Sequence, residues 1–273
     1  MASELPLFSR RRPFAPRLLV GSGLGRLFGF SGTGGFCLTR SVIRPLLAAF
    51  FSLGSCGALV AALPVDPRRF DKEIAAFDRH DATNPPPKRP IVFVGSSSIR
   101  LWPDLSGSFP NLPVLNRGFG GSQLSDVLFH LDRTVLRYRP SRVVLYAGDN
   151  DLAEGKSPET IAADFETFVF TVRDKAGPIP IDFLAIKPSP KRFSLLPEQK
   201  RANHLVSEAA QRYPDVSVID VFSPLLDPRG EPNGKLFVVD RLHLGPAGYA
   251  LWNQVVGDHL TNARPAKVAG PAP

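Results

Sequence analysis

The sequence predicts an α/β protein in which a five-stranded parallel sheet lies between two layers of helices. Short apolar segments, typical of strands buried on both faces, alternate along the chain with longer segments of helical periodicity. This alternation is typical of βαβ units, whose strands run parallel to one another. The chain of 273 residues is 43% hydrophobic, which is sufficient for one large buried core.

Five segments have the composition of strands in such a sheet. The first, residues 91–94, is continuously apolar and is followed by Gly95. The others are residues 114–116, 142–147, 181–186 and 216–220. Right-handed crossovers between them give a three-layer α/β/α sandwich, flavodoxin-like in strand order. Ligands bind at the carboxyl ends of the strands in such sheets, so we expect functional residues in the loops that follow the strands.

Helices are predicted between and after these strands. Residues 157–174 begin with Ser157 as the cap and Pro158 at the first position, and both residue types are favourable there. Apolar residues at helical spacing predict further helices over residues 123–138, 197–212 and 246–260.

Residues 64–90 and 263–273 are interpreted as segments that flank the domain. The first is expected to be a linker that contains a short helix, because it has helical spacing at Phe70, Ile74 and Phe77 and then a run of prolines. The second is expected to be a flexible tail. The predicted domain therefore spans residues 91–262.

The N-terminal residues have the features of a targeting sequence. Residues 1–44 are rich in Gly, Ser, Arg and Phe, and we interpret them as disordered or as sequence translated upstream of the true start. Residues 45–63 are apolar and follow two arginines, which is typical of a signal peptide or of a membrane anchor. Cys56 ends a stretch similar to a bacterial lipobox, so lipidation there is a further alternative. We expect an exported protein, whether periplasmic, secreted or membrane-anchored.

The basic charge of the chain is concentrated in the same region. The formal net charge is +8, but residues 1–69 hold nine arginines and two acidic residues, which leaves 24 basic and 23 acidic residues for the rest. A nearly neutral body lacks the positive surface that nucleic acid requires, so we expect no nucleic-acid partner. Both cysteines, Cys37 and Cys56, precede the body, so it has neither an internal disulfide nor a cysteine metal site.

Four polar segments lie where the sheet rule places functional residues. Taken alone, each is weak evidence, since serines often cap helices and glycine-rich turns can bind phosphate. The chain has no Walker lysine motif, no G-x-G-x-x-G and no G-x-S-x-G, which disfavours nucleotide binding and the usual α/β-hydrolase elbow. The segments are Gly95-Ser96-Ser97-Ser98, residues 116–122, Gly148-Asp149-Asn150-Asp151 and Asp240-Arg241-Leu242-His243.

In this order and spacing, the four segments resemble the signature blocks of the SGNH (GDSL-like) hydrolases. The letters S, G, N and H correspond to Ser97, Gly121, Asn150 and His243. The sequence is similar to the bacterial branch that resembles the platelet-activating-factor acetylhydrolase alpha subunits. It departs from the family pattern at Ser96, where an aspartate is usual. The resemblance implies an SGNH hydrolase domain over residues 91–262.

The resemblance also implies a mechanism. Ser97 would be the nucleophile, His243 its general base, and Asp240 the carboxylate that orients the histidine ring. The backbone amides of Ser97 and Gly121 and the side-chain amide of Asn150 would form the oxyanion hole. Gly120 is an alternative to Gly121 as the oxyanion donor. No metal or cofactor would be required.

Each of these residues also has a purely structural interpretation. Ser97 could be no more than a helix cap, Gly121 could merely supply the geometry of a turn, and Asn150 could bond its own backbone. Asp240 and His243 could be a helix cap and a surface histidine. The occurrence of all four blocks in order favours the functional interpretation.

Several nearby residues are candidates for the substrate pocket. Trp102, Phe119 and Tyr146 could line it, although Trp102 is equally compatible with the core. Lys187 begins the basic stretch of residues 187–192, which could bind an acidic substrate group but is interpreted as a solvated loop. Two carboxylates flank Asn150, and we expect Asp149 and Asp151 to bond local backbone rather than a metal.

The leading hypothesis is an exported serine esterase that acts on short acyl esters, such as acetyl groups on carbohydrate. A lysophospholipase or an acyltransferase of the same fold is an alternative within the enzyme class. A non-catalytic module that binds carbohydrate or lipid is an alternative from another class. The expected partner is a small ester or an acylated carbohydrate, and membrane contact is expected only through the N-terminal segment or a lipid on Cys56. The sequence does not predict an oligomeric state.

Overall fold

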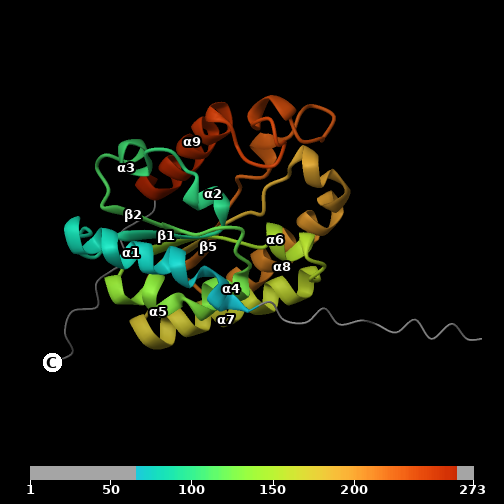
Figure 1. Cartoon of the computed structure of the whole chain (residues 1–273). Helices are drawn as coiled ribbons and strands as arrows, with labels where there is room; N and C mark the ends of the chain where they lie inside the picture. The colour runs from blue at the N-terminus through green and yellow to red at the C-terminus, as the bar shows by residue number, and fades with distance from the viewer. Residues whose placement is uncertain (1–65, 263–273) are drawn as a thin grey trace, which may run out of the picture. The chain divides into compact units, whose positions relative to one another are not determined.

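A computed structural model describes residues 66–262, and its middle layer is a sheet of five parallel strands (Figure 1). The strand order is β2-β1-β3-β4-β5. This arrangement confirms the predicted α/β class and the flavodoxin-like order. The strands are β1 (Ile91–Gly95), β2 (Val114–Gly118), β3 (Arg142–Tyr146), β4 (Ile181–Leu184) and β5 (Val216–Ile219).

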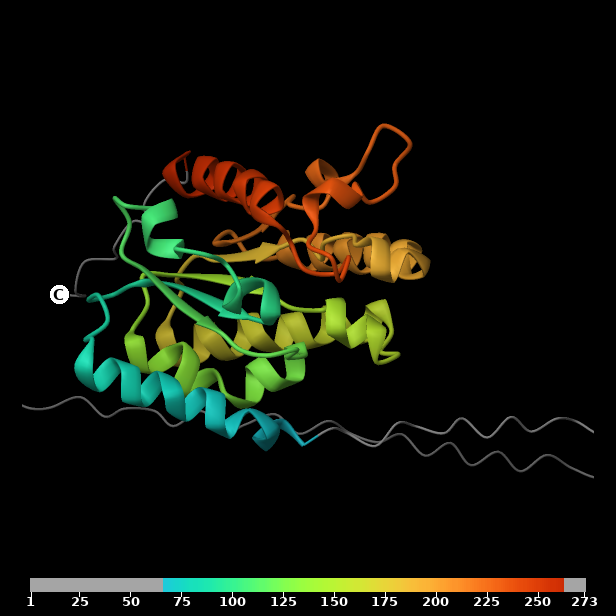
Figure 2. The same cartoon turned by 45° about the horizontal axis from the view of Figure 1, so that its top comes forward.

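Helices cover both faces of the sheet, as Figures 1 and 2 show. One face is covered by α2 (Ser97–Arg100), α3 (Leu105–Ser108) and α9 (Pro246–Asn262). The opposite face is covered by α1 (Asp71–Thr83), α4 (Leu124–Phe129), α5 (Leu131–Thr134), α7 (Pro158–Ala176) and α8 (Leu196–Ala210). The remaining short helices are α6 (Asp149–Ala153), η1 (Pro67–Phe70), η2 (Leu136–Tyr138), η3 (Pro190–Leu195), η4 (Ser223–Leu225) and η5 (Gly234–Leu236).

Two hydrophobic cores lie on the two faces of the sheet. In β1, Val92 and Val94 belong to the core under α1, α4, α7 and α8, while Ile91 and Phe93 belong to the core under α2, α3 and α9. Successive side chains of a strand point to opposite faces, so a strand buried on both sides must be apolar throughout. This requirement explains the continuously apolar run from which β1 was predicted.

The segment from Asp66 to Thr83 is not the predicted linker. Its helix is present but longer than expected, since η1 leads directly into the thirteen residues of α1. Phe70 and Ile74 are buried in the core, and the ring of Phe70 packs edge-on against that of Phe119 at 5.1 Å. The segment therefore belongs to the folded unit, because its apolar stripe completes one of the two cores.

The helix predicted over residues 123–138 is interrupted. It is divided into α4, α5 and η2, and His130 stands between the first two. The ring of His130 is buried, and its Nε2 atom lies 2.9 Å from the carbonyl oxygen of Pro67. The break thus allows a side chain of this segment to bond the backbone of η1. By contrast, α7 begins as predicted, since the Ser157 hydroxyl accepts a hydrogen bond from the amide of Thr160 at 3.1 Å.

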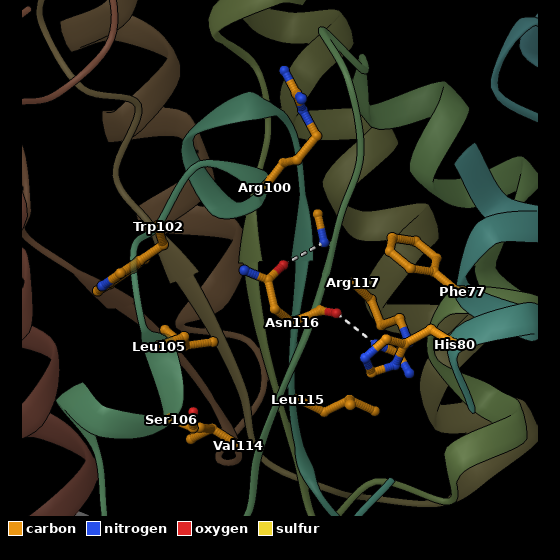
Figure 3. Close-up of a pocket in the computed structure, with 11 residues that line it drawn as sticks. Phe77, His80, Arg100, Trp102, Leu105, Ser106, Val114, Leu115, Asn116 and Arg117 are labelled. Carbon is orange, nitrogen blue, oxygen red and sulfur yellow. Dashed lines mark hydrogen bonds between the residues drawn. The ribbon is translucent and has the colours of Figure 1, made fainter. Parts of the chain in front are cut away.

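Strand β2 forms one edge of the sheet, and two of its outward backbone groups are bonded by its own side chains (Figure 3). The register with β1 turns the backbone groups of Asn116 and Gly118 away from the sheet. The Gly118 amide donates to Oδ1 of Asn116 at 2.9 Å, and Nη1 of Arg117 donates to the Asn116 carbonyl at 2.7 Å. The Asn116 side chain also donates to the carbonyl of Ile99 at 2.7 Å, which ties the edge to α2.

Residues 1–65 and 263–273 lie outside the described part of the chain. The predicted extension over 1–44, the signal or anchor segment over 45–63 with Cys56, and the predicted tail therefore remain predictions. Within residues 66–262, no helix combines the length and apolarity that a membrane span requires.

Candidate active site

Three of the predicted site residues meet at the carboxyl end of the sheet. The Nε2 atom of His243 lies 3.0 Å from Oγ of Ser97, and its Nδ1 atom lies 2.6 Å from Oδ2 of Asp240. Ser97 begins α2 directly after β1, whereas the other two residues precede α9, so segments almost 150 positions apart converge here. A serine, an imidazole and a carboxylate joined in this order have the geometry of a catalytic triad.

The turn after β1 determines which serine faces the site. Ser96 and Ser98 are each 2% exposed, while Ser97 is more accessible and lines the cavity beside His243. Gly95 makes the turn possible, since its φ is +133° and an added Cβ would lie 1.8 Å from the carbonyl oxygen of Tyr146. No other residue type fits this conformation and this approach. Helix α2 is only one turn long, so its dipole contributes little at Ser97.

The loop that carries Asp240 and His243 is organised by the carboxylate. Its Oδ1 atom accepts hydrogen bonds from the amides of Leu242 and His243 at 2.8 and 2.9 Å, which leaves Oδ2 for the histidine ring. Burial raises the pKa of Asp240, but the hydrogen bonds from the ring and these amides outweigh it and hold the pKa well below its ordinary value. Asp240 therefore caps the local turn and orients the ring at the same time.

Arg241, between these two residues, has a left-handed backbone with φ of +58°. This conformation is unfavourable for a residue with a Cβ, and such strain is often found at functional sites. The Arg241 carbonyl accepts a hydrogen bond from the amide of Lys191 at 3.0 Å, which holds the loop against η3.

Gly121 and Asn150 face the same cavity as Ser97. The Nδ2 atom of Asn150 lies 3.9 Å from the position that a Cβ on Gly121 would occupy. The Gly120 amide is already bonded to Oε2 of Glu73 at 2.9 Å, whereas no acceptor within residues 66–262 takes the amide of Gly121. This difference favours Gly121 over Gly120 as the predicted oxyanion donor.

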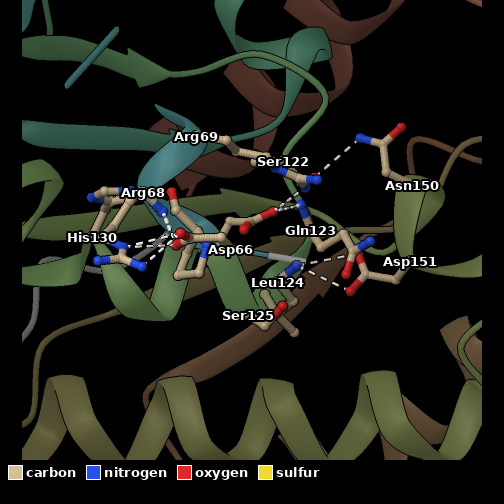
Figure 4. Close-up of polar contacts among 12 residues, drawn as sticks. Asp66, Arg68, Arg69, Ser122, Gln123, Leu124, Ser125, His130, Asn150 and Asp151 are labelled. Atoms are coloured by element: carbon tan, nitrogen blue, oxygen red, sulfur yellow. Dashed lines mark hydrogen bonds and ion pairs between the residues drawn. The ribbon is translucent and has the colours of Figure 1, made fainter. Parts of the chain in front are cut away.

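Hydrogen bonds hold the loop that carries Gly121 from three sides (Figure 4). The Asp126 carboxylate accepts from the amide of Gln123 at 2.8 Å and is paired with Arg69 of η1 at 2.8 Å. The Asp151 carboxylate accepts from the local amide of Gly148 at 3.1 Å, as predicted, and also from the distant amide of Leu124 at 3.1 Å. The Nδ2 atom of Asn150 donates to the carbonyl of Ser122 at 3.0 Å.

The cavity at this site has a volume of about 210 Å³, and most of the residues that line it have polar or charged side chains. It is lined by Ser97, Arg100, Gly121, Asp149, Asn150, Lys187, Arg192, Leu242 and His243. A larger cavity of about 430 Å³ lies along β2 (Figure 3), and Ser97 and His243 are not among the residues that line it. Size alone would thus point to the wrong place, and the arrangement of reactive groups identifies the smaller cavity as the candidate active site.

The aromatic residues predicted to line the substrate pocket belong to the cores instead. Trp102, Phe119 and Tyr146 are 3%, 0% and 0% exposed, and none of them lines the cavity at Ser97. Trp102 packs against Trp252, and its indole nitrogen donates to Oδ1 of Asn253 at 2.7 Å. Trp102 and Tyr146 belong to the core under α9, and Phe119 belongs to the core under α1, where burial removes their apolar surface from water.

Lys187 does line the cavity, but the stretch that it begins is not a solvated loop. Lys187 is only 1% exposed, and its Nζ atom lies 3.2 Å from Oδ2 of Asp149 and 2.9 Å from the carbonyl of Leu242. Arg192 pairs with the same carboxylate oxygen at 2.8 Å. Burial raises the pKa of Asp149, but the two adjacent cations outweigh it and lower the pKa below its ordinary value.

This buried group of charges was missed in the sequence. Asp149 does not bond local backbone as predicted, but binds two cations that follow β4 and the side chain of Gln199 from α8 at 3.3 Å. The sequence did contain a signal for it, since Asp149 follows β3 while Lys187 and Arg192 follow β4, and the carboxyl ends of neighbouring parallel strands lie side by side. Within residues 66–262, no group of three or more His, Cys, Asp or Glu side chains is arranged to hold a metal ion.

The α/β/α fold and the contacts that join Ser97, His243 and Asp240 match the arrangement expected of a serine hydrolase. The chain belongs to the GDSL-like lipase/acylhydrolase family, whose model matches residues 93–251, and it is therefore an ester hydrolase. This membership confirms the resemblance to SGNH hydrolases on which the prediction of function depended.

Solved structures show the same fold in bacterial proteins. A proposed platelet activating factor from Streptococcus pneumonia is 24% identical, with a TM-score of 0.62 over 70% of this chain and 93% of that one. A proposed acylhydrolase from Bacteroides fragilis is 20% identical, with a TM-score of 0.58 over 68% and 96%. An acetyl xylan esterase from Geobacillus stearothermophilus is 13% identical, with a TM-score of 0.51 over 64% and 95%. No curated protein sequence matches the chain significantly.

Proposed function

We propose that the protein is a serine esterase in which Ser97, His243 and Asp240 form the catalytic triad. The observation that carries the proposal is the 3.0 Å contact between His243 Nε2 and Ser97 Oγ, together with the 2.6 Å contact between His243 Nδ1 and Asp240. A serine hydroxyl is a weak nucleophile near neutral pH and needs a base within hydrogen-bond distance. The contact with His243 meets this requirement, and Asp240 fixes the ring in the tautomer that accepts the proton.

The reaction follows from this geometry in two stages. Oγ of Ser97 attacks the ester carbonyl carbon while His243 takes its proton, and the negative charge that develops on the carbonyl oxygen is stabilised by the amides of Ser97 and Gly121 and by Nδ2 of Asn150. The carbon–oxygen bond to the alcohol breaks, and the alcohol leaves with the proton from His243. Water, deprotonated by His243, then attacks the acyl-serine, and the acid is released as Ser97 regains its proton.

The proposed substrates are short acyl esters, with acetyl groups on carbohydrate as the leading class. The cavity measures about 210 Å³, and within the described chain Leu242 is the only lining residue with an aliphatic side chain. A small cavity with this lining favours a short acyl group and a polar alcohol. One protein with the same fold is an acetyl xylan esterase. The predicted export of the chain would bring the enzyme into contact with extracellular or periplasmic carbohydrate.

The triad is tested by hydrolysis of p-nitrophenyl acetate. We expect Ser97→Ala to lower kcat by at least about 10³-fold, because the remaining donors alone cannot form the acyl-enzyme. Ser98→Ala is the matched control, since this neighbouring hydroxyl is buried and lies outside the cavity. Equal activity of the Ser97→Ala variant and the wild type would refute the catalytic assignment, and inactivity of the folded wild type would favour a binding module.

The substrate class is tested by a panel of p-nitrophenyl esters of increasing acyl length, together with acetylated oligosaccharides. We expect kcat/KM to be highest for acetyl and to fall with each added pair of methylenes, because a cavity of about 210 Å³ has little room for a longer acyl chain. Faster turnover of long acyl chains would contradict this expectation and favour a lysophospholipase. Acyl transfer to an added sugar alcohol in preference to water would favour an acyltransferase.

A further inference from the structure

We propose that Arg192 is a positioning residue that fixes the side-chain amide of Asn150 in the orientation needed to donate to the oxyanion. The inference rests on the proposed function, since it assigns a role to a residue that acts through Asn150. Arg192 lies on η3, after β4, in the basic stretch interpreted from the sequence as a solvated loop.

The amide of Asn150 lies between a donor and an acceptor. Nη2 of Arg192 donates to Oδ1 at 3.0 Å, and Nδ2 donates one hydrogen to the carbonyl oxygen of Ser122 at 3.0 Å. The Nδ2 group has a second hydrogen, which is available on the side of the cavity and of Gly121. One side-chain amide can therefore hold its position and still donate to the substrate.

The two partners also exclude the flipped orientation. A turn of the amide by 180° would place NH₂ against the guanidinium, which has no acceptor, and would place Oδ1 against the Ser122 carbonyl oxygen. It would also present an oxygen to the negative charge of the transition state. Ser122 alone disfavours the flip through one contact, whereas Arg192 adds a charge-assisted hydrogen bond that favours the productive orientation.

Arg192 is itself held firmly. Its Nη1 atom lies 2.8 Å from Oδ2 of Asp149, and the arginine side chain is only 18% exposed. Asp149 directly precedes Asn150 and is ionised at neutral pH, because the adjacent cations lower its pKa. One guanidinium thus forms an ion pair with Asp149 and a hydrogen bond with Asn150, two consecutive side chains at the start of α6. Lys187 shares the carboxylate and bonds the Leu242 carbonyl, which connects the group to the loop that carries His243.

A double-mutant cycle on p-nitrophenyl acetate hydrolysis tests the proposal. We expect Arg192→Met to lower kcat by about 10-fold with KM almost unchanged, which is less than the 10²–10³-fold typical for loss of a whole oxyanion donor. We expect Asn150→Ala to show that larger loss, and Arg192→Met to cause no further loss when it is added to Asn150→Ala. Arg192→Lys should restore part of kcat, because an ammonium can still donate to Oδ1.

Two controls separate the proposal from a general effect on folding. Arg212→Met removes an arginine from an exposed ion pair with Glu166 at the other end of the sheet, and it should leave kcat unchanged. If the Arg192→Met variant is unfolded because Asp149 loses a partner, the double-mutant cycle with Asn150→Ala is carried out with Arg192→Lys instead.

The outcomes distinguish this inference from the proposed function. If Asn150→Ala lowers kcat while the Arg192 variants retain it, or if the two effects multiply, Arg192 does not act through Asn150 and the inference fails alone. If Asn150→Ala leaves kcat unchanged, the oxyanion role of Asn150 fails, and the inference fails with it.

Discussion

At the scale of single residues, Gly95 determines where the Ser97 hydroxyl points. The chain leaves β1 with a φ of +133° at this glycine, and its Cα approaches the Tyr146 carbonyl so closely that no side chain fits. The following amide, of Ser96, then donates to the same carbonyl at 3.0 Å. The turn is therefore locked to β3, and the second residue after it, Ser97, is carried to the edge of the cavity.

This arrangement predicts a large difference between two glycine substitutions. Gly95→Ala should lower the free energy of unfolding by at least about 4 kcal/mol, because it combines an unfavourable φ with a backbone clash. Gly155→Ala, at a φ of +85° in open space, should cost only about 1–2 kcal/mol. Urea unfolding of both variants tests the comparison, and similar losses would show that the clash at Gly95 is relieved by movement of β3.

Asp240 offers a second prediction at this scale. Asp240→Asn should lower kcat for p-nitrophenyl acetate by about 10³–10⁴-fold, because an amide that donates to His243 Nδ1 stabilises the wrong ring tautomer. The fold should be preserved, since the asparagine oxygen can still accept from the amides of Leu242 and His243. A loss of less than about 10-fold would mean that another group orients the histidine.

At the scale of the helices and strands, α1 connects the core to the loop that carries Gly120 and Gly121. Its Ile74 is fully buried, and its Glu73 accepts the hydrogen bond of the Gly120 amide at 2.9 Å. The side chain of Glu73 also lies within 2.8 Å of where a Cβ on Gly120 would be. Helix α1 thus positions the residue next to Gly121 although it precedes the predicted domain in the sequence, a role that a linker could not have.

The packing of α1 predicts that the domain depends on it. Ile74→Ala should lower the free energy of unfolding by about 2–5 kcal/mol, as is usual for a fully buried aliphatic side chain. Lys72→Ala, on the exposed side of the same helix, should change it by less than about 0.5 kcal/mol. Thermal or urea unfolding measures both, and equal effects of the two substitutions would mean that α1 is only loosely attached.

Strand β1 could be predicted to within about two residues because burial on both faces demands an unbroken apolar run, as at Ile91–Gly95. Helix α1 was taken for part of a linker because only one narrow stripe of it is buried, and a proline run follows. Ser97, Asp240 and His243 could be predicted because the sheet rule and the family blocks locate them. Arg192 could not, since its partners are set by tertiary contacts that no local pattern specifies.

At the scale of the whole molecule, buried carboxylates make stability dependent on pH. Asp182 in β4 is bonded by Nη1 of Arg142 at 2.7 Å, by the Ser217 hydroxyl at 2.6 Å and by Nε2 of His259 at 2.9 Å. Burial raises the pKa of Asp182, but these partners outweigh it and lower the pKa below its ordinary value. The pKa of Asp149 is lowered in the same way, whereas burial raises the pKa of Asp151 despite the nearby Lys156.

The sign of the effect of Asp182 follows from this shift. A carboxyl with a lower pKa in the folded state contributes its stability above the unfolded value of about 3.9, and the contribution is lost as the pH falls through the folded value. Asp151 works in the opposite direction. We expect the wild type to lose stability below about pH 4, and Asp182→Asn to lose less over the same range while being less stable at pH 7. Urea unfolding between pH 2.5 and 7 tests this, and parallel pH profiles for the two proteins would contradict it.

The edge of the sheet at β2 has a consequence for how copies of the molecule behave toward one another. An incoming strand would need the outward amide of Gly118 and the outward carbonyl of Asn116, yet both are already satisfied by side chains of the same strand. Growth of the sheet on that side would first have to break these bonds and displace a guanidinium. Crowded solutions of this enzyme are thus protected at β2 against the edge-to-edge association by which β-proteins form aggregates.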